Sequence, residues 1–336
     1  MPRRSAVSLG DIASMDNLTT AFWEAARGKR LREDVWRFEQ NLPAELARLA
    51  DDIREGRSPD GHWSCFRIYD PKPRRILAPS FRDRVLHHAL MQHVAPVLER
   101  GLVDDTFACR EGKGTLAAVY RAQTHLRRFP YFVKADVRAY FASIDHAILR
   151  RILARRFKNP GVLALFDRIL ERTPDPSGRG LPIGALTSQW FANVYLDGLD
   201  RFLLEHLRVP AMVRYMDDFV FWCHSRKNAM LALDVTRSFL HDVRHLEIKT
   251  DGCPGRSCAG VAFLGFRVLP GSLRLSLRRR RRYAAARARW EEAWQSGGVD
   301  ACGLQAGYAS ALAMTAHADA RGFRRANLQR RKPVDA

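Results

Sequence analysis

The sequence predicts an α+β fold, in which helices pack around an antiparallel sheet. Two observations predict the strands: Pro130-Tyr-Phe-Val-Lys-Ala-Asp136 is a short apolar run, and β-branched and aromatic residues flank Asp217 and Asp218 in Ala211-Met-Val-Arg-Tyr-Met-Asp-Asp-Phe-Val-Phe-Trp222. The second pattern is typical of a β-hairpin with both acids at its tip. A third observation predicts the helices, because apolar residues recur with helical spacing over several long segments.

The composition predicts a folded protein with a polyanionic partner. The chain has 336 residues, 46% of them hydrophobic, which is enough for a full core in one to three domains. Its 56 Lys and Arg against 36 Asp and Glu give a formal charge of +20, which favours nucleic acid over an anionic membrane. No apolar run approaches the roughly 20 residues of a spanning helix, and Met1-Pro-Arg-Arg-Ser5 lacks a signal-peptide pattern. We expect a cytoplasmic protein whose cysteines are reduced and which does not bind membranes.

The first 130 residues are predicted to be mainly helical. Residues 16–60 carry a helical apolar stripe that a basic loop interrupts at 27–32. Residues 61–80 are predicted to be extended, because closely spaced prolines exclude a helix interior. Helices are expected again at 81–99 and 115–127.

The rest of the chain alternates helices with short strands. Helices are predicted over 145–170, 186–206 and 225–243, and a strand over 260–268 that can pair with 274–277. The last 60 residues are predicted to be helical and include five consecutive arginines at 278–282.

The acids at the strand ends predict a metal site. Asp136 ends one strand, Asp217 and Asp218 lie in the hairpin, and an antiparallel sheet can bring them together. Clustered carboxylates repel one another unless cations neutralise them, and oxygen ligands of this kind suit Mg²⁺. Two Mg²⁺ ions about 4 Å apart serve phosphoryl transfer, including nucleotide polymerisation. The alternative for Asp217 and Asp218 alone is an exposed acidic turn.

In their order along the chain, these motifs resemble those of reverse transcriptases over about residues 15–325. Asp136 with Phe141 resembles the first acidic motif, and Tyr215-Met-Asp-Asp218 matches the Y-x-D-D box. Gly180-Leu-Pro-Ile-Gly-Ala-Leu-Thr-Ser-Gln189 resembles the motif that contacts template and nucleotide. Lys249-Thr250 resembles the later lysine motif, and Phe263-Leu-Gly-Phe266 resembles the primer grip.

The resemblance implies a right-hand polymerase fold with fingers, palm and a short helical thumb, which makes DNA from an RNA template and dNTPs. The palm would carry the antiparallel sheet. The implied division is an N-terminal helical extension at 1–60, fingers at 61–130 and 147–180, palm at 131–146 and 181–270, and a basic helical thumb at 271–336.

The resemblance also implies roles for single residues. Asp136 and Asp217 would hold two Mg²⁺ ions, which Mn²⁺ could replace, with the Val137 carbonyl as a further ligand and Asp218 as a nearby carboxylate. Lys249 would protonate the pyrophosphate as a general acid; the alternative is a surface lysine.

Four residues are expected to contact the incoming nucleotide. Lys72 and Arg74 would clamp the triphosphate, and their alternative is a solvated basic loop. Phe141 would exclude a ribose 2′-hydroxyl, and Gln189 would lie near the base pair or the phosphates. For both, packing is the alternative interpretation.

Five residues are expected to contact template or primer. Ile183 and Gly184 would lie near the templating base, and a strand formed by Phe263, Leu264 and Gly265 would press on the primer backbone. The basic C-terminal segment would bind the RNA–cDNA duplex through counterion release.

A finer resemblance is to the reverse transcriptases of diversity-generating retroelements, which carry the I-G-x-x-x-S-Q pattern of Ile183-Gly184 and Ser188-Gln189. It implies an error-prone enzyme, encoded by a bacterium or phage, with a small basic accessory protein that can be oligomeric. A departure is Ala185, where many of these enzymes have a polar residue. Defence-associated antiviral and retron-like bacterial reverse transcriptases remain the alternative, and a catalytically silent RNA-binding protein is a further one.

Overall fold

The N-terminal region is a helical layer in the computed structural model, which describes residues 4–69, 73–172, 177–249 and 253–334. The Phe22 ring stacks on Phe38 at 5.9 Å between centroids, and Phe38 meets Phe81 edge-on at 5.3 Å. This aromatic contact joins three helices of the layer. Its helices are α1 (Leu9–Ile12), α2 (Met15–Ala26), α3 (Glu33–Gln40), α4 (Leu42–Arg54) and α5 (Phe81–Glu99).

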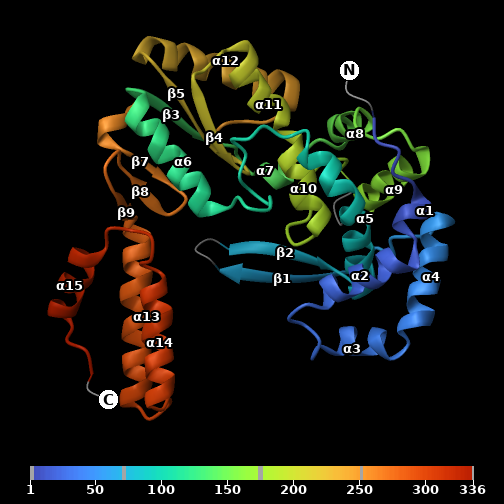
Figure 1. The fold of residues 1–336 in the computed structure, drawn as a ribbon, viewed down its shortest axis with the longest axis horizontal. Coiled ribbons are helices and arrows are strands. Elements are labelled where there is room, and N and C mark those ends of the chain that lie inside the picture. The colour runs from blue at the N-terminus through green and yellow to red at the C-terminus, as the bar shows by residue number, and fades with distance from the viewer. Residues whose placement is uncertain (1–3, 70–72, 173–176, 250–252, 335–336) are drawn as a thin grey trace.

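An antiparallel hairpin, β1 (Trp63–Tyr69) and β2 (Pro73–Pro79), extends from the helical layer toward the other half of the molecule (Figure 1). Its base is tied to α5, since the buried Asp83 carboxylate accepts the backbone amides of Asp60 and Gly61, each at 2.9 Å. Most of the hairpin itself is exposed.

The central sheet is antiparallel and has the strand order β4-β5-β3-β6. Helix α12 (Arg226–Arg244) packs on one face and α6 (Thr115–Arg128) on the other, so the strands between them are almost fully buried (Figure 1). The predicted strand and hairpin are both confirmed. The strands are β3 (Tyr131–Asp136), β4 (Ala211–Tyr215), β5 (Asp218–Cys223) and β6 (Gly255–Arg256).

The helices between β3 and β4 are more divided than predicted. Asn159 caps α9 and Pro160 begins it, so the predicted helix 145–170 is two helices. The prediction of a single helix over 186–206 was also wrong, because this part of the chain consists of three short helical segments. In chain order the segments are α7 (Tyr140–Ser143), α8 (His146–Ala154), α9 (Pro160–Glu171), α10 (Leu186–Tyr195), α11 (Asp197–Arg201) and the π-helical turn η1 (Phe202–His206).

A second antiparallel sheet follows the turn η2 (Ser257–Ala259) and contains β7 (Val261–Phe263), β8 (Phe266–Val268) and β9 (Leu273–Leu275). The predicted single strand over 260–268 was wrong. Leu264 and Gly265 form a tight turn with φ values of +47° and +85°, and a Cβ on Gly265 would lie 2.7 Å from the Arg279 Nε. The positive φ of Gly265 therefore favours glycine at this turn, and the absence of a Cβ leaves room for the Arg279 side chain.

The C-terminal unit consists of α13 (Leu277–Gln295), α14 (Ala301–Ala313) and α15 (Arg321–Arg330), and extends below the second sheet (Figure 1). Gly307 lies against the Trp290 ring, which lets α13 and α14 approach closely. Within the described residues, no helix has the length and apolar character needed to cross a membrane.

Candidate active site

The three predicted carboxylates meet at one end of the central sheet. Asp136 is directly opposite Asp218 in the β3–β5 pairing, and Tyr215 is opposite Asp218 in the β4–β5 hairpin. Directly opposed residues of an antiparallel pair point to the same face, so the Asp136 and Asp218 side chains share one face. Met216 and Asp217 form the two-residue turn between the strands.

The backbone fixes this turn against the first acidic motif. The Val137 amide donates to the Asp217 carbonyl at 3.3 Å. Met216 has a φ of +58°, a left-handed conformation that residues with a Cβ seldom adopt. The turn therefore directs Asp217 back toward the end of β3.

Two lysines contact the carboxylates. The Lys249 Nζ lies 2.8 Å from the Asp136 Oδ1, and the Lys134 Nζ lies 3.4 Å from the Asp218 Oδ2. Lys249 was predicted at the site, whereas Lys134 was missed. Its sequence signal is its place two residues before Asp136, since alternate residues of a strand share a face.

The two lysines do not supply enough positive charge to keep all the carboxylates ionised at their ordinary pKa values. Burial and the neighbouring Asp136 carboxylate raise the pKa of Asp217. Burial also raises the pKa of Asp218 to about 7, and the Lys134 ammonium offsets only part of this effect. The Asp218 Oδ1 is buried without a hydrogen-bond partner. A further cation at this position would stabilise the ionised carboxylates.

The donor set fits a hard divalent cation. In the part of the chain that the structure describes, no three His, Cys, Asp or Glu side chains already have the geometry of a metal site. The Asp136–Lys249 pair is 37% and 44% exposed, so it contributes little free energy and a cation can displace it. The buried Asp218 Oδ1 and the close Asp217 and Asp136 carboxylates supply the oxygen ligands that Mg²⁺ prefers.

Phe141 lies in the short helix α7, five residues after Asp136. Its ring is half-buried and meets Tyr140 edge-on at 5.9 Å between centroids. The Tyr140 ring is buried, whereas its Phe141 neighbour retains exposed surface. The Phe141 carbonyl accepts the Leu181 amide at 2.7 Å, which joins α7 to the segment that carries Ile183.

The segment that includes Ile183 and Gly184 lies against hairpin strand β2. The Leu77 amide donates to the Ile183 carbonyl at 2.9 Å. Gly184 has a φ of +129°, and a Cβ there would lie 2.7 Å from the Leu77 carbonyl oxygen. Gln189 is exposed in α10, with its Oε1 3.5 Å from the Cys109 Sγ.

The remaining predicted residues lie on other elements. Arg74 is exposed on β2 of the hairpin, and Lys72 lies outside the described residues. Phe263 is buried in β7, while Leu264 and Gly265 form the β7–β8 turn instead of the predicted strand. They belong to the second sheet, not to the sheet of the carboxylates.

Comparison with known proteins gives a family and a fold. Residues 69–268 match the family model for "Reverse transcriptase (RNA-dependent DNA polymerase)". The Escherichia coli (strain K12) protein YkfC is 22% identical over 185 residues, which are 50% of this chain and 47% of that protein. The group II intron-encoded protein LtrA of Lactococcus lactis subsp. cremoris is 24% identical over 140 residues, which are 40% of this chain and 23% of that protein. The chain thus matches less than half the length of either relative.

A solved structure supports the predicted right-hand fold. Telomerase from Candida albicans, in complex with the TWJ fragment of telomeric RNA, superposes with a TM-score of 0.50 at 11% identity. The superposition covers 82% of this chain and 57% of the telomerase chain. The family model covers well over half of the chain and includes the strand that ends at Asp136 and the hairpin at Asp217 and Asp218. The chain therefore belongs to the reverse transcriptase (RNA-dependent DNA polymerase) family.

Proposed function

We propose that the protein is an RNA-directed DNA polymerase, which copies a template RNA into cDNA from dNTPs. The observation that carries this proposal is the meeting of Asp136, Asp217 and Asp218 at one end of an antiparallel sheet, inside the region that matches the family. An exposed acidic turn would not leave a buried carboxylate oxygen without a partner, as Asp218 does.

In this proposal Asp136, Asp217 and the Val137 carbonyl hold two Mg²⁺ ions, and Asp218 adds charge beside them. When bound, such ions activate the primer 3′-hydroxyl and stabilise the departing pyrophosphate; Mn²⁺ can replace them. The Lys249 ammonium would donate a proton to pyrophosphate, and its distance of 2.8 Å from Asp136 supports a place for it at the site.

The predicted nucleotide and template contacts complete the proposal. Lys72 and the exposed Arg74 of β2 would bind the triphosphate, and Gln189 would bind the base pair or the phosphates. Ile183 and Gly184 would face the template. Phe263 and the β7–β8 turn at Leu264 and Gly265 would face the primer. The duplex would then pass along the basic α13.

The same proposal assigns the parts of the chain. Residues 61–130 and 147–180 would be the fingers, 131–146 and 181–270 the palm, and 271–336 the thumb, preceded by the helical extension 1–60.

We further propose that the enzyme is the error-prone reverse transcriptase of a bacterial or phage diversity-generating retroelement, acting in the cytoplasm with a small basic accessory protein. The Ile183-Gly184 and Ser188-Gln189 pattern supports this, because an apolar Ile183 beside the templating base offers it no hydrogen bond. The alternative is a defence-associated or retron-like enzyme, which would share the chemistry and differ in its RNA.

Primer extension on a mixed-sequence RNA template, followed by sequencing of the cDNA, tests both the proposed polymerase activity and the proposed retroelement class. Asp217→Ala should abolish synthesis and leave RNA binding intact in a gel-shift assay, and residual synthesis above ~1% of wild type would contradict the proposed metal role. Asp234→Ala, a similar change on the exposed face of α12, is the control. Misincorporation concentrated opposite template adenines is expected of the retroelement enzyme, whereas uniformly low error at all four bases would favour the alternative.

A further inference from the structure

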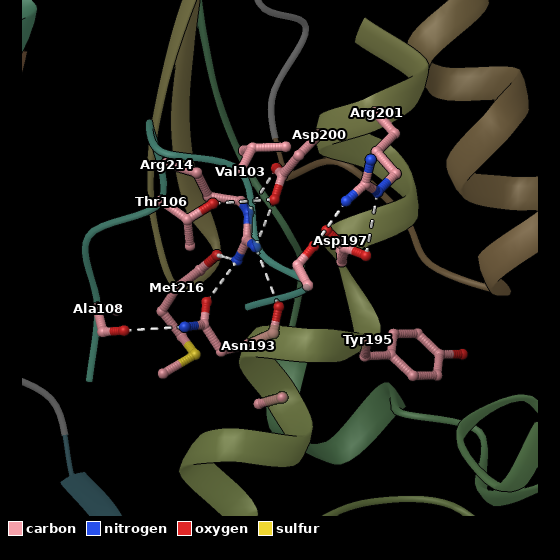
Figure 2. Close-up of polar contacts among 12 residues, drawn as sticks. Val103, Thr106, Ala108, Asn193, Tyr195, Asp197, Asp200, Arg201, Arg214 and Met216 are labelled. Carbon is pink, nitrogen blue, oxygen red and sulfur yellow. Dashed lines mark hydrogen bonds and ion pairs between the residues drawn. The ribbon is translucent and has the colours of Figure 1, made fainter. Parts of the chain in front are cut away.

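A buried arginine lies on the strand that leads into the turn of Met216 and Asp217, with Tyr215 between them. Arg214 is on β4, and its side chain and that of its partner Asp200 are both 0% exposed. The Arg214 Nε donates to the Asp200 Oδ1 at 2.7 Å and the Nη2 to the Oδ2 at 2.6 Å (Figure 2). Burying an ion pair seldom adds stability compared with apolar residues of similar size, so stability alone does not explain this pair.

All five N–H groups of the Arg214 guanidinium have acceptors. Three of these acceptors belong to residues other than Asp200. Two are the side-chain and backbone oxygens of Asn193, each at 3.0 Å. The fifth is the carbonyl oxygen of Met216, at 3.0 Å from the Nη1 (Figure 2). Arg214 therefore binds the backbone of the residue that precedes Asp217.

That carbonyl belongs to the strained part of the turn. Met216 has a φ of +58°, and such a conformation persists in a residue with a Cβ only when its surroundings hold it. The hydrogen bond from Arg214 fixes the direction of the Met216–Asp217 peptide. The Asp217 carbonyl is in turn held by the Val137 amide, so the turn is restrained from both sides.

The anchor of Arg214 is itself rigid. Thr106 Oγ1 donates to the Asp200 Oδ2 at 3.1 Å, and Asn193 Nδ2 donates to the Ala108 carbonyl at 2.8 Å (Figure 2). Backbone bonds link Arg214 to the same segment, because its amide donates to Asp105 and its carbonyl accepts from Phe107, each at 2.9 Å. Helices α10 and α11 and the segment 105–108 thus hold one guanidinium.

We propose that Arg214 is a positioning residue, whose guanidinium holds the left-handed turn at Met216 and so places the Asp217 carboxylate beside Asp136 before any metal ion binds. Lysine could keep the charge opposite Asp200, but its single ammonium cannot also reach Asn193 and Met216 with the geometry of the planar fork. The effect of Arg214 on metal affinity rests on the proposed function, whereas its effect on the rigidity of the turn does not.

Arg214→Lys is the main test, because it keeps the charge and removes the fork. Hydrogen–deuterium exchange of residues 213–219, in metal-free protein without nucleic acid, should become faster than in wild type. The dissociation constant for Mn²⁺, measured by electron paramagnetic resonance, should rise about 10- to 100-fold, as for other residues that orient metal ligands. Arg287→Lys is the matched control, since Arg287 and Glu291 form another buried pair, 3% and 0% exposed, in the C-terminal unit. It should change neither readout at the turn.

A charge-free double variant, Arg214→Met with Asp200→Leu, separates positioning from charge neutralisation. It leaves no unpaired buried charge, and circular dichroism and thermal unfolding check its fold. We expect it to exchange rapidly at 213–219 and to bind Mn²⁺ weakly. Exchange and Mn²⁺ affinity equal to wild type in either folded variant would overturn the positioning role. If wild type itself fails to bind Mn²⁺, the proposed function fails, and the metal-free exchange measurement still decides the role of Arg214.

Discussion

Two neighbouring aromatic residues of the short helix α7, which follows Asp136, differ in burial. Tyr140 is buried, and its hydroxyl donates to the Ala192 carbonyl. Phe141 is half-buried and lies near the end of β3, where the incoming sugar is expected. Tyr140 therefore belongs to the core, whereas Phe141 keeps the exposed surface that the proposed contact with the sugar requires.

Phe141→Ala should raise ribonucleotide incorporation relative to deoxyribonucleotides by roughly 10-fold or more, because the ring is proposed to exclude the 2′-hydroxyl. Single-nucleotide primer extension with matched rNTP and dNTP gives the ratio. Tyr140→Phe is the control, as it removes only a buried hydrogen bond worth about 1 kcal/mol and should leave selectivity unchanged. An active Phe141→Ala enzyme with wild-type selectivity would show that Phe141 only packs.

At the scale of elements, the hairpin β1–β2 is joined to the segment before α10 by a close backbone contact. The Leu77 amide binds the Ile183 carbonyl, and Gly184 lies so close that a Cβ would reach 3.0 Å from the Ile76 Cγ2. The proposed contact of the hairpin with the nucleotide and the proposed contact of Ile183 with the template thus both depend on Gly184.

Gly184→Ala should be more destabilising than Gly178→Ala. Both glycines have positive φ, +129° and +72°, but nothing lies within 4 Å of a Cβ at Gly178. The left-handed backbone at Gly178 costs an alanine about 1–2 kcal/mol, and the φ of +129° at Gly184 lies outside the region that L-residues adopt. Forcing the Leu77 backbone away should add about 1–3 kcal/mol for Gly184 alone. Urea denaturation measures both. Equal losses in the two variants would mean that the hairpin contact gives way without cost.

At the scale of the whole molecule, the basic side chains that give the charge of +20 do not all serve the same purpose. In the arginine run of α13, the Arg279 guanidinium lies 4.1 Å from the Phe266 ring and the Arg280 guanidinium 5.6 Å from the Phe323 ring. Both are half-buried, whereas Arg281 is exposed. Part of the run therefore joins α13 to its neighbours, and part is available to a nucleic-acid backbone.

Arg281→Gln should weaken binding of an RNA–DNA duplex, and the slope of log affinity against log salt should fall by about 1, since one phosphate contact is lost. Arg279→Gln should instead lower the unfolding temperature, because a cation–π contact with Phe266 is removed. Duplex titrations at several salt concentrations and thermal melts of both variants compare the two. A salt slope unchanged by Arg281→Gln would contradict the proposed duplex path along α13.

The sequence by itself determined most of the local elements and the identity of the three acids. The run before Asp136 is short and apolar, and β-branched and aromatic residues dominate the two runs around Asp217 and Asp218. This composition is typical of strands, so the strand and the hairpin were predictable. Helices with an apolar stripe, such as α2 with Leu18, Ala21, Phe22 and Ala25 on its buried face, were predictable from their helical period. Motif order along the chain then indicated the family that the comparisons show.

Only the tertiary structure decided which residues face one another. The register that sets Asp136 opposite Asp218, and the approach of Lys134 to Asp218, depend on pairing between distant segments. The division of residues 186–206 into three helical segments and the turn at Leu264 also arise from packing against neighbours. Arg214 reads in sequence as one charge in an apolar strand. Its partners come from α10, α11 and the turn itself, and burial, which no local pattern specifies, makes each of those bonds obligatory.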